Sequence, residues 1–258
     1  MNYKIILEYD GSRYNGWQRQ GNTDSTIQGK LEEILSKYFN QDVEIHGSGR
    51  TDAGVHATGQ VANFKVCPHK KLSVVTNNDI LCDLNNFLPE DIRILSLESV
   101  DERFHARLNA KEKTYRYTFC LVNKRSVFER KYCALLPNAS SHFAIPDIEL
   151  MKSASLSLLG EHDLLGFSDT KTKKSTIRRI DNISFKIEDI CHCKYLTVDF
   201  TGNGFLYHTI RLLMGTLIQI GLHNCQPSIV EEILYSKDRK KVPYMAPAEG
   251  LTLVEVKY

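Results

Sequence analysis

The order of apolar and polar residues predicts both strands and helices in the first half of the chain. Alternation of apolar and polar positions is typical of strands, and apolar residues three to four positions apart are typical of amphipathic helices. These patterns predict strands at 4–9, 42–45, 61–66 and 92–97, and helices at 27–38 and 77–87. A capping box of Ser25 and Gln28 is expected to begin the first helix, and Pro89 to stop the second.

The second half shows the same mixture. Strands are predicted at 115–122, 180–187, 195–200 and 253–256, and helices from Pro146 to Gly160 and at 207–222. Because loops and hairpins join neighbouring strands as often as helices do, the pattern favours an α+β fold with mostly antiparallel sheets. The boundary falls near residues 103–112, which predicts an N-terminal domain at 1–107 and a C-terminal domain at 108–258.

A glycine-rich segment at 46–56 carries the main candidate chemistry. It places Gly47, Gly49 and Gly54 around Asp52, with Arg50 two residues before the carboxylate. Glycine permits tight turns and close approach to the main chain, so this segment is poor core material. A loop of this kind between two predicted strands is typical of a functional site.

Other interpretations of this loop are open. Asp52 could cap a short helix beginning at Ala53, with Gly47 and Gly49 in a simple tight turn. The loop lacks the spacing of a nucleotide phosphate-binding motif. A metal site on Asp52 and His56 would lack a further ligand pair nearby.

Composition indicates an ordinary globular protein. The 258 residues are 42% hydrophobic and 25% charged, which is sufficient for a sizeable core. No segment approaches the length of a membrane span and no signal peptide is recognisable, so we expect a cytoplasmic protein without membrane contact. The seven cysteines are scattered, and only Cys191-His192-Cys193 is closely spaced, so reduced thiols are expected rather than a metal site.

The formal net charge of +2 does not by itself indicate a nucleic-acid-binding protein, but the basic residues are clustered. Clusters of this kind are compatible with local phosphate contacts, although a charge run is often only a solvated face. The first cluster is Lys171, Lys173, Lys174, Arg178 and Arg179, the second is Arg107, Lys111, Lys113 and Arg116, and the third is Lys237, Arg239, Lys240 and Lys241.

The segment GRTDAGVH at 49–56 resembles the catalytic loop of the tRNA pseudouridine synthase A family. Further sequence motifs similar to those of this family occur in the same order along nearly the whole chain. They are LEYDG at 7–11, GWQRQ at 16–20, TIQ at 26–28, FHAR at 104–107, KTYRY at 113–117, FLYH at 205–208 with Arg211, GTL at 215–217 and AEGL at 248–251.

The resemblance implies an isomerase that converts uridine to pseudouridine in the anticodon stem-loop of tRNA, at positions 38–40. The N1–C1′ bond is broken and C5 is joined to C1′, without metal or organic cofactor. It further implies that Asp52 is catalytic, that Arg50 helps to displace the base, that Tyr115 stacks on the uracil and that Arg211 pairs with the aspartate.

The resemblance also implies two similar α+β halves, whose sheets join across a central active-site cleft, and a homodimer that holds one tRNA. Lys173, Lys174 and Arg178 are expected to contact its phosphates. One departure is Leu212, where many members carry Asn. The same chemistry at another RNA position and a non-catalytic RNA-binding module are alternatives.

Physical chemistry supports part of this interpretation directly. A uridine in a helix must be flipped out before its sugar can react. A glycosidase would normally need a second carboxylate, and none flanks Asp52 in the loop. Arg211 stands among apolar residues and needs an anion, for which Asp52, Asp199 and Glu249 are candidates. Whether Asp52 attacks the sugar, adds to the uracil ring or acts as a base stays open.

Overall fold

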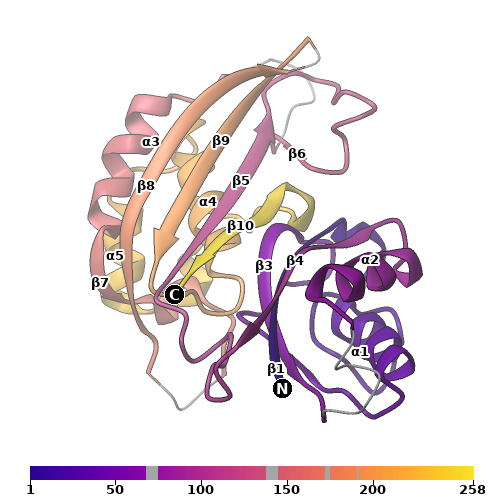
Figure 1. Cartoon of the computed structure of the whole chain (residues 1–258). Helices are drawn as coiled ribbons and strands as arrows, with labels where there is room; N and C mark the ends of the chain where they lie inside the picture. The colour runs from indigo at the N-terminus through magenta and orange to yellow at the C-terminus, as the bar shows by residue number, and fades with distance from the viewer. Residues whose placement is uncertain (68–74, 138–144, 172–174, 191) are drawn as a thin grey trace. The chain divides into compact units, whose positions relative to one another are not determined.

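The computed structural model describes residues 1–67, 75–137, 145–171, 175–190 and 192–258, which form helices and a mostly antiparallel sheet (Figure 1). The α+β class with mostly antiparallel strands is therefore confirmed. Contacts group the chain into an N-terminal unit of residues 1–111 with 253–258 and a C-terminal unit of residues 112–252. The last strand thus clusters with the first unit, while the domain boundary between residues 107 and 108 stays a prediction.

The N-terminal unit is built on strand β1 (Asn2–Tyr9). This strand pairs antiparallel with β3 (His56–Lys65) and with β4 (Ile92–Val100), and β2 (Ile45–Gly47) pairs with β3. Strand β10 (Leu251–Lys257) follows β3 in the strand order. These strands confirm most of the alternation predicted from the sequence.

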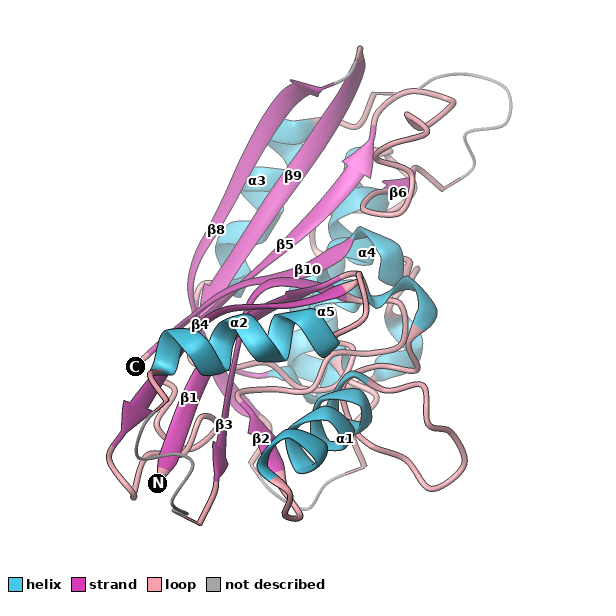
Figure 2. Cartoon of the chain, turned by 45° about the vertical axis from the view of Figure 1, so that its right-hand side comes forward, coloured by secondary structure: helices cyan, strands magenta, loops and turns pink. Residues whose placement is uncertain are grey.

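Two helices, α1 (Ile27–Phe39) and α2 (Asn77–Phe87), complete this unit (Figure 2). The buried ring of Phe39 lies 6.3 Å from Tyr3 on β1 and 5.8 Å from Phe64 on β3, so α1 packs on the buried face of the sheet. Helix α2 has the predicted bounds. It begins with a capping box between Thr76 and Asp79.

Two local predictions for this unit are wrong. The N-cap of α1 is Thr26, not Ser25, because the Thr26 side chain accepts a hydrogen bond from the amide of Gly29. Gln28 is instead buried, and its amide group donates to Glu32 and to the carbonyl of Ile45. The strand predicted from Asp42 begins only at Ile45, since the amide of Val43 donates to the Ser36 hydroxyl rather than to a neighbouring strand.

The C-terminal unit has its own antiparallel strands. The predicted hairpin is confirmed as β8 (Ile177–Ile190) and β9 (Cys193–Gly202), and β9 also pairs with β5 (Glu112–Cys120). The sequence patterns did not predict two short strands. These are β6 (Ala134–Leu135), parallel to β5, and β7 (Gly160–Asp163), antiparallel to β8.

Helix α4 (Thr209–Gly221) is the most completely buried helix of this unit and lies within the predicted segment. The side chains of Leu212, Leu213 and Leu217 are fully buried, and burial of such a side chain is worth about 1.5–3 kcal/mol. Gly215 permits close packing, because a β-carbon there would lie 2.1 Å from the carbonyl oxygen of Tyr244.

Two further helices are α3 (Ile148–Ser155) and α5 (Ile229–Ser236), of which α5 was not predicted. The prediction that a helix continues to Gly160 is wrong: residues 156–158 form a 3-10 turn, and Gly160, at φ +96°, begins β7. Within the described ranges, no helix combines the length and the apolar character needed to cross a membrane.

Candidate active site

The glycine-rich loop joins β2 to β3 and is anchored before Asp52 by buried polar groups. The amide of Ser48 donates to the carbonyl of Val61 at 2.7 Å, and its hydroxyl donates to Gln60 Oε1 at 2.7 Å. Gln60 Nε2 in turn donates to the carbonyl of Gly49 at 3.0 Å. Since Ser48 and Gln60 are both fully buried, these contacts fix the first half of the loop.

The residue directly before Asp52 is held just as firmly. The hydroxyl of Thr51 lies 2.8 Å from that of Tyr9, and its carbonyl accepts a hydrogen bond of 3.0 Å from the amide of Trp17. After Asp52 the chain turns, with the amide of Val55 donating to the carbonyl of Asp52 at 3.1 Å. Asp52 therefore sits half-buried in a fixed turn and does not cap a helix.

Glycines in and beside this loop serve packing as well as turning. A β-carbon on Gly47 would lie 2.5 Å from the indole of Trp17, which is 2% exposed. Gly54 has φ +78° in the turn after Asp52, a conformation that favours glycine. The close approach that glycine permits at Gly47 is thus to Trp17 within the fold.

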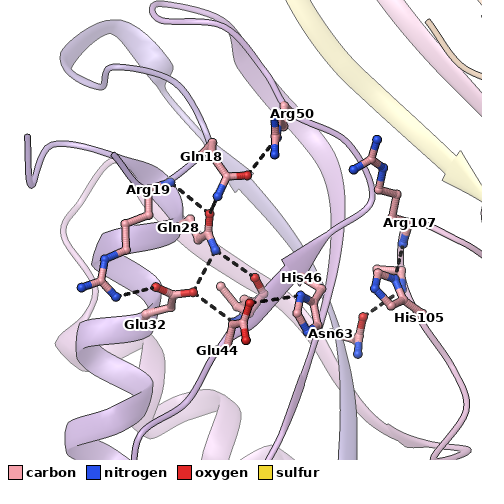
Figure 3. A network of polar contacts seen from close by, with 12 residues as sticks. Gln18, Arg19, Gln28, Glu32, Glu44, His46, Arg50, Asn63, His105 and Arg107 are labelled. Carbon is pink, nitrogen blue, oxygen red and sulfur yellow. Dashed lines mark hydrogen bonds and ion pairs between the residues drawn. The ribbon is translucent and has the colours of Figure 1, made fainter. Parts of the chain in front are cut away.

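Arg50 is exposed, but its side chain is oriented by the polar network that Figure 3 shows. Its Nε donates to Gln18 Oε1 at 2.9 Å, and Gln18 Nε2 donates to Gln28 Oε1 at 2.6 Å. Gln28 continues the chain to Glu32 at 2.9 Å. The orientation of the Arg50 side chain is therefore stabilised by Gln18 and Gln28. The sequence patterns did not predict this support.

His56 is buried and makes polar contacts within the fold. It is 3% exposed, its Nδ1 accepts a hydrogen bond from the amide of Gly11 at 3.1 Å and lies 3.3 Å from Asp10 Oδ1. Among the described residues, no group of three or more His, Cys, Asp or Glu side chains is arranged to hold a metal ion. Cys191 of the closely spaced Cys-His-Cys segment lies outside the described residues.

A second feature of the N-terminal unit is a pair of stacked histidines, which Figure 3 also shows. The rings of His46 and His105 lie 5.0 Å apart at 19°. Burial lowers the pKa of His105 below its usual value, and electrostatic interaction with His46 and Arg107 adds to the decrease. His46 lies on β2, and His105 lies on the segment that precedes β5.

In the C-terminal unit, Tyr115 lies on β5 and is 8% exposed. Its ring contacts Phe205 edge to face, with centroids 5.5 Å apart at 89°. The neighbouring Arg116 binds both carboxylate oxygens of Asp199, at 2.7 and 2.8 Å. Asp199 is therefore the partner of Arg116, which disfavours it as the anion for Arg211.

Arg211 lies half-buried near the start of α4. Its Nε donates to the carbonyl of Ala246 at 2.8 Å, and the amide of Ala246 donates back to the carbonyl of Arg211 at 3.0 Å. Burial raises the pKa of Tyr244, with Glu249 adding to the increase and Arg211 opposing it. Arg211 and Glu249 thus both influence the pKa of Tyr244. Glu249 also lies 3.5 Å from Arg125.

The basic clusters are only partly available to a ligand. In the first, Arg178 donates to the carbonyls of Ser175 and Ile177, and Arg179 pairs with Asp181, while Lys173 and Lys174 lie outside the described residues. In the third, Lys237 pairs with Asp163 at 2.7 Å and Arg239 with Asp169 at 2.8 Å. Ion pairing therefore accounts for part of each cluster.

Comparison with known proteins agrees with the family indicated by the sequence motifs. The family model described as tRNA pseudouridine synthase matches residues 5–109 and 154–258. A "tRNA pseudouridine synthase A" of Bacillus sp. (strain KSM-64) is 42% identical over 257 residues, covering 100% of this chain and 99% of that protein.

Two further relatives are similar over the same extent. The "tRNA pseudouridine synthase A 2" of Bacillus cereus (strain ZK / E33L) is 38% identical, and the "tRNA pseudouridine synthase A 1" of Clostridium tetani (strain Massachusetts / E88) is 40% identical. Each alignment covers 100% of this chain and 99% of the relative. The chain belongs to the tRNA pseudouridine synthase family.

Proposed function

We propose that this chain isomerises uridine to pseudouridine in the anticodon stem-loop of tRNA, at positions 38–40, without metal or organic cofactor. The observation that carries the proposal is Asp52. It is the carboxylate of a loop whose flanking residues are fixed by buried hydrogen bonds, in a chain that belongs to the family. Fixed positioning is what a catalytic group needs to act on one atom of its substrate.

Residues of the loop and of β5 are suited to different steps of the reaction. Flipping a base out of a helix costs a few kcal/mol, and the flipped nucleotide must be held. Arg50 is exposed and oriented by Gln18, which suits it to occupy the vacated space and to contact phosphate. The ring plane of Tyr115 is fixed by Phe205, which suits it to stack on the uracil. Asp52 then acts on the nucleotide as the catalytic group.

Arg211 is proposed to be the basic partner of Asp52, across a cleft between two similar halves. A cation on an otherwise apolar helix is costly unless it faces a negative charge. The match of the family model to both 5–109 and 154–258 supports the two-halves arrangement. Pairing would keep Asp52 ionised, because a nearby arginine lowers the pKa of a carboxylate.

The active species is proposed to be a cytoplasmic homodimer that holds one tRNA across both subunits. The net charge of +2 leaves each chain with only small basic areas. Two copies of the segment from Lys171 to Arg179 would supply a broader surface for phosphates. Lys173, Lys174 and Arg178 are the proposed contacts.

Mapping of pseudouridine in total tRNA tests the proposed function. Cells that lack this protein should lose pseudouridine at positions 38–40 and regain it when the wild-type chain is supplied. A loss at another position only would shift the proposal to a different target of the same chemistry. Unchanged pseudouridine throughout would refute it.

A further inference from the structure

Two aromatic side chains at the start of α4 form a stack that the proposed chemistry does not use. The rings of Tyr207 and His208 lie 3.7 Å apart at 28°. Tyr207 is 53% exposed, whereas the His208 side chain is only 14% exposed. One ring therefore faces the surface and the other supports it from the fold.

A single carboxylate holds this stack in place. Asp169 Oδ2 lies 2.6 Å from His208 Nδ1, and Asp169 Oδ1 accepts a hydrogen bond of 2.8 Å from Arg239 Nε. Burial alone would raise the pKa of Asp169, but the hydrogen bonds from His208 and Arg239 outweigh it, so the pKa is lowered and the carboxylate stays charged. Asp169 thus clamps its own loop, the start of α4 and the turn at Arg239–Lys241.

The backbone of the stack is fixed as well. The carbonyl of Tyr207 accepts hydrogen bonds of 3.2 Å from both the amide of Asp169 and the hydroxyl of Ser168. His208 has φ +66°, a left-handed conformation that costs about 1 kcal/mol or more in a residue other than glycine. The contacts of the imidazole with Tyr207 and with Asp169 offset this cost.

We propose that Tyr207, supported by His208, is a stacking platform for a nucleobase of the RNA substrate, outside the catalytic loop. An exposed tyrosine loses little conformational entropy on binding when its ring is already fixed, and every base has a π-face on which it can stack. This inference rests on the proposed function, since it takes the ligand to be tRNA.

The charge around the platform suits a nucleic acid. Lys240 and Lys241 are exposed and follow Arg239 directly, and Lys171 is exposed two residues after Asp169. Exposed ammonium groups attract the phosphates of a nucleic acid. The third basic cluster thus has two parts: Lys237 and Arg239 stabilise the fold, and Lys240 and Lys241 face solvent.

The test measures the affinity of purified variants for an unmodified tRNA transcript, by fluorescence anisotropy, together with kcat and KM for pseudouridine formation. Tyr207→Ala should weaken binding about 10-fold or more, in line with the loss of one base–aromatic stack. Tyr207→Phe, which keeps the ring, should bind like the wild type. Asp169→Asn should give an intermediate loss, because His208 then loses its charged support.

Tyr235→Ala is the matched control, because Tyr235 is 85% exposed on α5 and no described ring stacks on it. It should leave the affinity unchanged. If the wild type is active and Tyr207→Ala matches it in affinity and KM, the platform is refuted and the proposed function stands. A wild type that neither binds tRNA nor forms pseudouridine overturns both.

Discussion

The hydroxyl of Tyr9 on β1 lies 2.8 Å from the hydroxyl of Thr51, the residue directly before Asp52. Both side chains are buried, at 4% and 6% exposure, so water does not compete for this contact. The Thr51 carbonyl is at the same time fixed by the amide of Trp17. The position of Asp52 therefore depends on the central strand of its own unit.

Tyr9→Phe removes this hydroxyl and leaves the buried Thr51 hydroxyl without its Tyr9 contact. We expect the free energy of unfolding to fall by about 1–2 kcal/mol, measured by urea denaturation at neutral pH, and activity to fall with it. Tyr38→Phe is the control, because its hydrogen bond to Asp83 is exposed and joins α1 to α2 rather than to the loop. Equal losses of activity in both variants would contradict a specific role for Tyr9.

The same residue predicts a response to alkaline pH. Burial raises the pKa of Tyr9 from its usual value of 10 to about 12. The stability that the neutral Tyr9 phenol contributes is therefore complete below pH 10 and is lost as the pH rises through 12, because the unfolded chain releases the proton first. The loss amounts to about 3 kcal/mol for this group. The fall in unfolding free energy between pH 10 and 12 should be smaller in Tyr9→Phe, and an identical fall would argue against this assignment.

Gly47→Ala tests the packing beneath the loop. The added methyl group would lie 2.5 Å from the buried indole of Trp17, so the ring or β2 must move. Overpacking of this kind costs about 1–3 kcal/mol, which thermal unfolding would detect. Gly21→Ala is the matched control, since nothing lies within 4 Å of its added carbon, and it should be neutral. Similar stabilities for the two variants would show that Gly47 is not needed for packing.

The extent to which the sequence predicts this structure depends on the range of the interactions. Alternation and helical spacing are local, and they correctly predicted β1, the β8–β9 hairpin and the bounds of α2. The start of β2 was wrong because it depends on a contact between Val43 and Ser36, which no local pattern contains.

The same distinction applies to the candidate site. The loop itself was recognised from its residues, with Arg50 and Asp52 close together in sequence. Its supports were not, because Tyr9 and Gln18 lie 42 and 32 residues from the groups they contact. The Asp169–His208 contact, over 39 residues, was missed for the same reason.

Arg211 is expected to act on Asp52 rather than on the RNA. Arg211→Ala should reduce kcat at least 10-fold with a smaller change in tRNA affinity, because the compensating charge is lost. Arg211→Lys should be partly active, since lysine keeps the charge but not the forked geometry. Steady-state kinetics with tRNA transcripts would measure both. A loss confined to KM would instead make Arg211 a substrate-binding residue.

Phosphate contacts predict an affinity for tRNA that falls steeply with salt concentration. Charge reversal at Lys173, Lys174 and Arg178 should weaken binding and flatten this salt dependence, while kcat at saturating tRNA stays close to the wild-type value. Binding measured between 50 and 200 mM salt, the range over which such contacts change strongly, checks this. Unchanged affinity would remove this cluster from the RNA-binding surface.

The most direct test of the account is pseudouridine formation by Asp52→Asn. Asparagine keeps the size of the side chain and removes its charge, so the variant should still fold and bind tRNA. Turnover, measured on a tRNA transcript with the purified chain, should fall by orders of magnitude, in the range typical when a catalytic group is lost. Near-normal formation of pseudouridine by this variant would contradict the assignment of Asp52 as the catalytic group.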